Sequence, residues 1–139
     1  MSIRYPDMAA LILRLAFGSM MAFGHGYVKL LKLFSAEEIH FVTYFGLSAK
    51  TNLTLTAFAE FICCIMIIIG YKTRLFCIPV IIAMFVAAFK THLNDPLFMK
   101  NAESGSKEMA LIYMAAFLAI YFLGSGRYSV DDRIDSVLN

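Results

Sequence analysis

The sequence predicts an all-α integral membrane protein, with four transmembrane helices in an antiparallel bundle and a short interfacial helix between the first two. Hydrophobic residues make up 60% of the 139 residues and charged residues 16%, against about 25% charged in a typical soluble domain. So small a soluble protein would need a larger polar surface than these residues supply. The length fits a single domain over 1–139. The net charge of +2 is too small to indicate a nucleic-acid partner, and the expected partner is the lipid bilayer.

The first transmembrane helix is predicted over about 8–31. Pro6 and Asp7 precede it, and both residue types suit the first turn of a helix. A secretory signal peptide is the competing interpretation of this region. Arg14 interrupts the apolar run and no small-residue cleavage site follows, so we expect the segment to be retained.

The interfacial helix is predicted over about 36–46. Ser35 and Glu38 have the spacing of a capping box, in which each side chain bonds the other residue's backbone N–H. Apolar residues then recur at helical spacing, at Ile39, Val42 and Phe45. Gly46 is a suitable helix end.

The other three transmembrane helices are predicted over about 53–70, 75–90 and 108–123. Their apolar runs are shorter than the roughly 20 residues that span a bilayer. Lys90 and Lys107 stand at segment ends, where long basic side chains can reach the membrane surface. The polar tail from Arg127 onward is expected to lie along the surface.

An even number of crossings places both termini on one side of the membrane. The two sides carry nearly equal numbers of Lys and Arg residues in their loops. The very short loop over 71–74 holds Lys72 and Arg74 close to the helix ends, which favours cytoplasmic termini.

Glu60 is the most informative residue, because a carboxylate inside an apolar helix is costly and needs a partner or a function. It stands seven residues past Leu53, about 10 Å into the segment at 1.5 Å per residue. When each helix is given its direction, other ionisable residues fall in the same half of the bilayer: His25, Lys29, Lys90 and Glu108. Together they predict a polar pocket for a ligand or a proton. In the alternative, Glu60 pairs with Lys29 or Lys90 only to fix the helix register.

Two features of the first helix support this site. His25 and Lys29 are four residues apart and therefore share a helix face. Gly24 and Gly26 flank His25 and allow another backbone, or a ligand, to approach closely.

Arg14 falls in the opposite half of the bilayer, where no carboxylate lies at matching depth. Its candidate partners are the Tyr121 hydroxyl, carbonyls freed by Gly124 and Gly126, or Asp131 folding back from the tail. We favour Asp131 as a structural tether, with an anionic-lipid site as the alternative.

The three cysteines indicate neither a redox pair nor a metal site. Cys63 and Cys64 are adjacent, Cys77 lies in the next segment, and no Cys-x-x-Cys occurs. We expect reduced packing residues and no metal.

With these residues located, the chain resembles the DoxX family. The matching features in the first helix are Leu13-Arg14-Leu15 with Gly18, then His25-Gly26-Tyr27-Val28-Lys29-Leu30. Later matches are Glu60, Gly70 with Arg74, Glu108, and the closing motif Gly124-Ser125-Gly126-Arg127-Tyr128-Ser129-Val130-Asp131. Gly26, Arg127 and Asp131 are expected to have structural roles within these motifs.

The resemblance implies a four-helix protein of the bacterial inner membrane, associated with a quinol oxidase or thiosulfate:quinone oxidoreductase system. A stand-alone enzyme is not expected, and a catalytic role would be as part of a quinone-linked oxidoreductase. His25 has no partner histidine at its depth, since His40 and His92 lie in loops, which argues against haem. A quinone could be held without a metal. The implied protein partners are other membrane subunits or further copies of the chain.

Two other function classes remain open. The first is a structural or assembly subunit whose polar cluster only locks the helices together. The second is a small transporter or proton path. This hypothesis is weaker, because the half of the bundle around Cys63, Ile67 and Cys77 has no polar residue except Arg14 to continue a path from Glu60.

Overall fold

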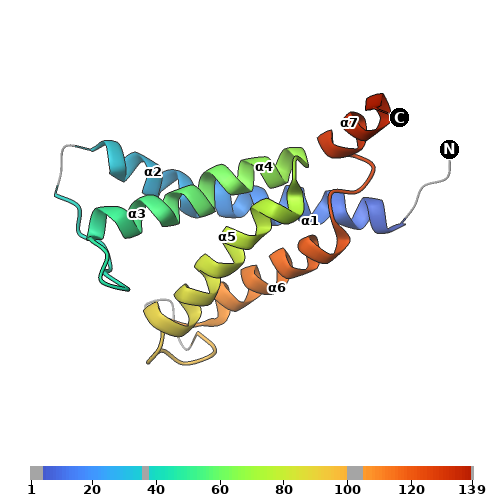
Figure 1. The fold of residues 1–139 in the computed structure, drawn as a ribbon. Helices are drawn as coiled ribbons and strands as arrows, with labels where there is room; N and C mark the ends of the chain where they lie inside the picture. Colours follow the sequence, from blue (N-terminus) through green and yellow to red (C-terminus); the bar gives the residue numbers. More distant parts are fainter. Residues whose placement is uncertain (1–4, 36–37, 100–104, 139) are drawn as a thin grey trace.

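A computed structural model describes residues 5–35, 38–99 and 105–138, and every regular element within these ranges is helical (Figure 1). The first long helix runs without a break through α1 (Tyr5–Met21), η1 (Ala22–Gly26) and α2 (Tyr27–Phe34). The second runs through α3 (Ala49–Ala57), η2 (Phe58–Cys63) and α4 (Cys64–Ile69). The third joins α5 (Thr73–Val86) to η3 (Ala87–Thr91), and α6 (Glu108–Leu123) and α7 (Val130–Leu138) follow. The three η elements are π-helical turns.

Three of these helices are long and apolar enough to cross a membrane: Tyr5–Phe34, Ala49–Ile69 and Thr73–Thr91. The apolar helix α6 is shorter, with 16 residues. At 1.5 Å per residue it extends about 24 Å, against a hydrocarbon core of about 30 Å. The all-helical membrane fold is therefore confirmed, with three long apolar helices and one shorter helix.

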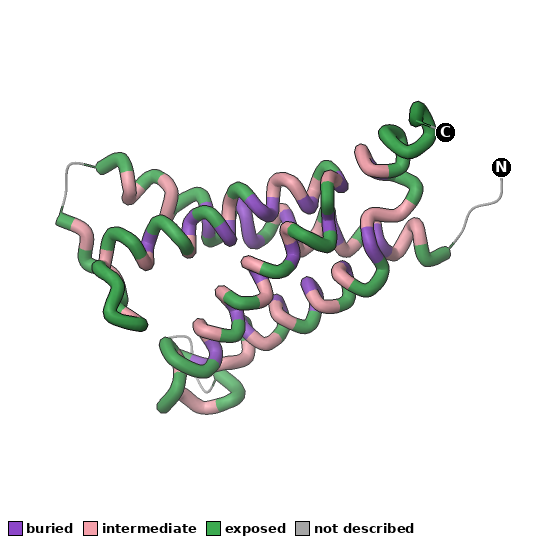
Figure 2. The backbone as a smooth tube through the Cα atoms, in the orientation of Figure 1, coloured by how far each residue is buried: buried purple, intermediate pink, exposed green. Residues whose placement is uncertain are grey.

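The helices pack as an antiparallel bundle in which α6 contacts both α5 and α1, and α1 also contacts α4. The interior is apolar and includes Met21, Cys64, Ile67, Val80 and Phe117. All three cysteines are free thiols and buried. Large apolar side chains are also exposed on the outside of the helices. Figure 2 shows exposed stretches along each helix. Helices that are apolar on all sides suit a lipid environment.

Local sequence signals set the ends of the second helix. The Ser48 side chain accepts a hydrogen bond from the Thr51 N–H at 3.2 Å and caps α3. The helix therefore begins four residues before the predicted position 53. Gly70 ends α4 in the left-handed conformation, with φ of 76°, which a residue without a Cβ adopts at little cost.

The predicted interfacial helix over 36–46 is wrong for its described part, because residues 38–46 form no helix. Side chains from the neighbouring helices hold this segment as a loop. Lys32 Nζ donates to the His40 carbonyl at 2.9 Å, and Asn52 Nδ2 donates to the Tyr44 carbonyl at 3.4 Å. Phe45 also has a positive φ of 57°, which a helix excludes. Positions 36 and 37, where the helix was expected to start, lie outside the described residues.

The tail contains the additional helix α7, which the sequence analysis did not predict. Three aspartates and one arginine make this segment polar overall, so its composition concealed its helical periodicity. Figure 1 shows α7 at the same end of the bundle as the beginning of α1 and the end of α4.

Candidate functional site

The predicted site contains an ion pair between two of the long helices. Lys29 Nζ, on α2, donates to Glu60 Oε2, on η2. The Glu60 side chain is 4% exposed and the Lys29 side chain 27%. The carboxylate is therefore enclosed, while the ammonium reaches the edge of the bundle.

π-Helical backbone carries Glu60 and directly precedes the helix that carries Lys29. Glu60 lies in η2, and η1, which contacts η2, ends at Gly26 one residue before α2. Each π turn accommodates one more residue than an α turn, and such turns occur frequently at functional sites. At this depth both helices depart from regular α geometry, and their π-helical turns η1 and η2 contact each other.

Gly26 explains how the two helices come so close. A Cβ added at Gly26 would lie 2.5 Å from the Glu60 carbonyl carbon and 2.6 Å from the Phe61 nitrogen. Backbone therefore packs directly against backbone at the position that holds the carboxylate. This contact supports the structural role expected for Gly26.

Gly26 is the last member of a row of small, buried residues four positions apart, Gly18, Ala22 and Gly26. A Cβ at Gly18 would lie 2.8 Å from a side-chain carbon of Ile68. Rows of small residues allow membrane helices to approach closely. The row aligns the first helix along the second.

Tyr113 lies close to Glu60, and His25 contacts Tyr113. His25 is exposed and contacts the Tyr113 ring edge-on, with ring centroids 5.6 Å apart. Tyr113, on α6, is 6% exposed and lies within electrostatic range of Glu60. Tyr113 was not predicted from the sequence, because only Asp, Glu, Lys, Arg and His residues were compared by depth.

Lys90 and Glu108 do not join this cluster. Lys90 is exposed, and its Nζ lies 5.6 Å from the centre of the Phe45 ring. Glu108 accepts a hydrogen bond from the Met99 N–H at 3.3 Å. Figure 1 shows the reason, since the α5 and α6 ends at this side of the bundle diverge from α2 and α3. Equal depth did not bring these residues to the same place.

The chemistry of the assembled site is hydrogen bonding with balanced charge. The Lys29 ammonium has three N–H donors, more than Glu60 alone occupies. The described residues contain no group of three or more His, Cys, Asp or Glu side chains that could hold a metal ion. The arrangement suits an uncharged acceptor such as a carbonyl oxygen, which leaves the charge balance of the pair unchanged.

Arg14 occupies a different environment, toward the other end of the bundle. It is fully buried, and its guanidinium donates to three backbone carbonyls. The distances are 3.3 Å from Nη1 to Ile67 O, 3.2 Å from Nη1 to Ile68 O and 2.7 Å from Nη2 to Tyr128 O. Carbonyls in the last turn of a helix lack the regular partner one turn ahead, so the end of α4 supplies two of these acceptors. The Ile67 carbonyl also accepts the Gly70 N–H at 3.1 Å, so Arg14 is its second donor.

The favoured partner of Arg14, Asp131, has another role. Asp131 Oδ1 accepts the Lys72 N–H at 2.9 Å, and the Asp131 N–H donates to Gly70 O at 3.1 Å. Asp131 does fold back onto the bundle, but it binds the α4–α5 turn. The Arg127 N–H donates to Asp7 Oδ1 at 3.4 Å. The tail is thus held by Arg14, by Asp131 and through the Arg127 backbone.

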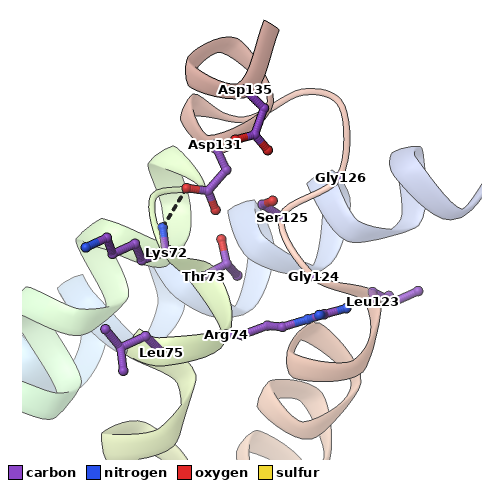
Figure 3. Close-up of a pocket in the computed structure, with 10 residues that line it drawn as sticks. All are labelled: Lys72, Thr73, Arg74, Leu75, Leu123, Gly124, Ser125, Gly126, Asp131 and Asp135. Carbon is purple, nitrogen blue, oxygen red and sulfur yellow. Dashed lines mark hydrogen bonds between the residues drawn. The ribbon is translucent and has the colours of Figure 1, made fainter. Parts of the chain in front are cut away.

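A cavity of about 550 Å³ lies at this same end of the bundle, not beside Glu60. Its lining comes from the start of α5, the end of α6, the linker over 124–126 and α7. Figure 3 shows Asp131 and Asp135 on the α7 side and Arg74 across the opposite wall. Arg74 Nε donates to the Tyr121 carbonyl at 3.2 Å, and Asp131 binds the Lys72 N–H. The Arg74 bond joins the start of α5 to α6, and the Asp131 bond joins α7 to the α4–α5 turn. Both charged groups are therefore engaged in contacts between elements, and the Lys29–Glu60 pair is the stronger site candidate.

One family model, DoxX, matches the chain over residues 9–93. This range covers more than half of the chain. It includes His25 and Lys29 of the first long helix and Glu60 of the second. No curated protein in the comparison matches the chain, and no solved structure matches it.

Proposed function

This chain belongs to the DoxX family of membrane proteins, and we propose that it is an accessory subunit of a membrane redox system that binds a quinone at the Lys29–Glu60 pair. In this proposal the protein holds the ligand within the bilayer, and a partner performs the electron transfer. The bacterial inner membrane is the proposed location.

Four crossings with cytoplasmic termini are part of the same proposal. The 16 residues of α6 are short for a bilayer, and Lys107 at its start can extend the span by reaching the membrane surface. The contacts of α6 with α5 and α1 support its place inside the membrane. The short basic turn at Lys72 and Arg74 supports the orientation.

The observation that carries the proposal is the unequal exposure of the ion pair. Glu60 is enclosed, and Lys29 reaches the edge of the bundle. A quinone carbonyl can accept a hydrogen bond from Lys29 while Glu60 continues to balance the charge. His25 is exposed on the same helix face and offers a second polar contact. Phe23 and Tyr27 pack near Phe61 on the neighbouring face and provide apolar surface for a ring or a tail.

The test is quinone content and binding in the full-length protein reconstituted in lipid nanodiscs. We expect bound quinone to fall at least tenfold in Glu60→Gln and in Lys29→Met. The matched controls are Glu108→Gln and Lys90→Gln, which remove charges at the same end of the bundle but outside the pair. Retained binding in folded Glu60→Gln and Lys29→Met protein would contradict the proposal.

A second candidate function, a structural or assembly subunit, is favoured by one observation. Each charge of the ion pair already has the other as its partner. The pair also lies where the Gly26 backbone touches that of Glu60. Such a pair can fix helix register without any ligand. The double variant Lys29→Met with Glu60→Met distinguishes the two roles: restored stability together with normal complex assembly, and no quinone at any stage, would favour the structural role.

Either role implies a protein partner, which we propose to be other membrane subunits or a second copy of the chain. Cross-linking in native membranes followed by mass spectrometry tests this point. A chain that is recovered only as an uncross-linked monomer would contradict it.

A further inference from the structure

The last helix, α7, is amphipathic although its overall composition is polar. At 3.6 residues per turn, its apolar residues fall within an arc of about 100°; they are Val130, Ile134, Val137 and Leu138. The opposite side holds aspartates and Ser136. Such a pattern needs an apolar neighbour for one face.

Nothing in the described part of the bundle covers this apolar face. The helix contributes no buried residue, and Val137 is 84% exposed and Leu138 77%. An apolar groove of about 320 Å³ runs along α7 and is lined by residues of α7 alone. Figure 2 shows the helix exposed along nearly its whole length.

The contacts of α7 fix its distance from the membrane. Its first turn is bonded to the α4–α5 turn through Asp131, Gly70 and Lys72. That turn joins two helices that are long and apolar enough to span the bilayer. Arg14 holds the preceding linker through the Tyr128 carbonyl. The helix therefore begins at the level where the spanning helices leave the membrane.

Exposed apolar side chains surround the same level on the bundle. Ile69 at the end of α4 is 45% exposed, Leu75 at the start of α5 is 57% and Leu123 at the end of α6 is 40%. Exposed apolar residues at the ends of membrane-spanning helices are expected to contact lipid. The exposed apolar residues of α7 therefore stand at the end of the bundle where the spanning helices also expose apolar side chains.

We propose that α7 lies in the surface layer of the bilayer as an interfacial helix, with Ile134, Val137 and Leu138 inserted among the lipids. Interfacial helices bury their apolar face about 5–10 Å into the headgroup and acyl boundary. Many such helices also use basic residues to bind anionic lipid. Here three aspartates oppose a single arginine, so apolar insertion is the source of binding. The contact does not require anionic lipid.

The experiment is a scan of spin-label accessibility along α7 in the full-length protein. Single cysteines replace each residue from 131 to 138 in turn, and the unsubstituted protein, with buried Cys63, Cys64 and Cys77, gives the background. We expect labels at 134, 137 and 138 to be accessible to oxygen and shielded from a water-soluble nickel chelate. Labels at 132 and 136 show the reverse. The pattern is the same in vesicles of phosphatidylcholine alone and in vesicles with added phosphatidylglycerol.

Three outcomes would overturn the proposal. Accessibility of every position to nickel would place α7 in water. Protection of 134, 137 and 138 from both reagents would indicate a protein partner, and dipolar broadening between labels would identify that partner as a second copy. A pattern that appears only with phosphatidylglycerol would make the contact electrostatic. Leu138→Asp should raise nickel access at 134 and 137 severalfold, and Ser136→Asp on the polar face should not change it.

Discussion

Arg14 and Glu60 are both buried charges in apolar helices, and their surroundings differ. Arg14 is completely enclosed and donates to three backbone carbonyls from two separate segments. Glu60 is enclosed too, but its partner is a side chain, Lys29, that reaches the edge of the bundle.

The difference indicates what each residue can do. The acceptors of Arg14 are backbone carbonyls and Arg14 itself is fully buried, so the residue joins α1 to α4 and the tail and has no exposed side for a ligand. The Lys29–Glu60 pair consists of two side chains with one end open. It can exchange or share a hydrogen bond without unfolding the bundle.

Removal of Arg14 should have the largest effect on stability. Arg14→Met removes this donor from three carbonyls. The Ile67 carbonyl keeps the Gly70 N–H, but the Ile68 and Tyr128 carbonyls lose the guanidinium, and an unsatisfied buried group costs about 1–3 kcal/mol. We expect the free energy of unfolding in detergent to fall by roughly 3 kcal/mol or more. Arg14→Lys should restore only part of it, because an ammonium does not reproduce the guanidinium fork. If the unfolding curves of Arg14→Met and wild type coincided, Arg14 would not stabilise the contact between α1, α4 and the tail.

Gly26→Ala should have the next largest effect. The added Cβ would meet the backbone of Glu60 at 2.5 Å, and overpacking of this kind costs typically about 1–3 kcal/mol. Gly24→Ala is the matched control, since no atom lies within 4 Å of a Cβ there. Thermal unfolding of both variants measures the difference. Equal melting temperatures for Gly26→Ala and Gly24→Ala would refute the close approach of the two helices.

The coupling between Lys29 and Glu60 should be smaller. A double-mutant cycle with Lys29→Met and Glu60→Gln measures it, and contacting residues show interaction energies of about 0.5–3 kcal/mol. We expect a value near the lower end, because Lys29 is 27% exposed and water or headgroups can solvate it once Glu60 is neutral. Additive single effects would mean that the pair is not formed in the membrane.

Lys90→Gln should have the smallest effect. Lys90 is exposed and lies over the Phe45 ring, and an exposed cation–π contact contributes about 0.5–1 kcal/mol. The change should leave quinone binding intact. A loss of binding as large as that of Glu60→Gln would place Lys90 in the site after all.

The sequence was sufficient for features that depend on residues along one helix. Apolar runs located the long helices, and the distance of Glu60 from its helix end placed it at the depth of Lys29. The family assignment followed from motifs around His25 and Glu60. These features need only helical rise and residue order.

Features that depend on rotation and on crossing were not predictable in the same way. Depth along a helix does not give the direction of a side chain around it, so Lys90 and Glu108 seemed to be neighbours of Glu60 and are not. The capping-box pattern at Ser35 predicted a helix, but bonds from Lys32 and Asn52 to loop carbonyls hold residues 38–46 in another form. Arg14 was expected to bind the Asp131 carboxylate. Its hydrogen-bond acceptors are instead backbone carbonyls of α4 and the tail, and Asp131 acts on it only through its charge.

The most direct test of the difference between the two buried charges is photo-cross-linking with a quinone that carries an azido group, in nanodiscs, with the labelled peptides mapped by mass spectrometry. The account predicts labels close to His25, Lys29 and Tyr113, competed by unlabelled quinone and absent in Glu60→Gln. It also predicts no label close to Arg14. Saturable labelling around Arg14 and Tyr128, with none around Lys29, would contradict it.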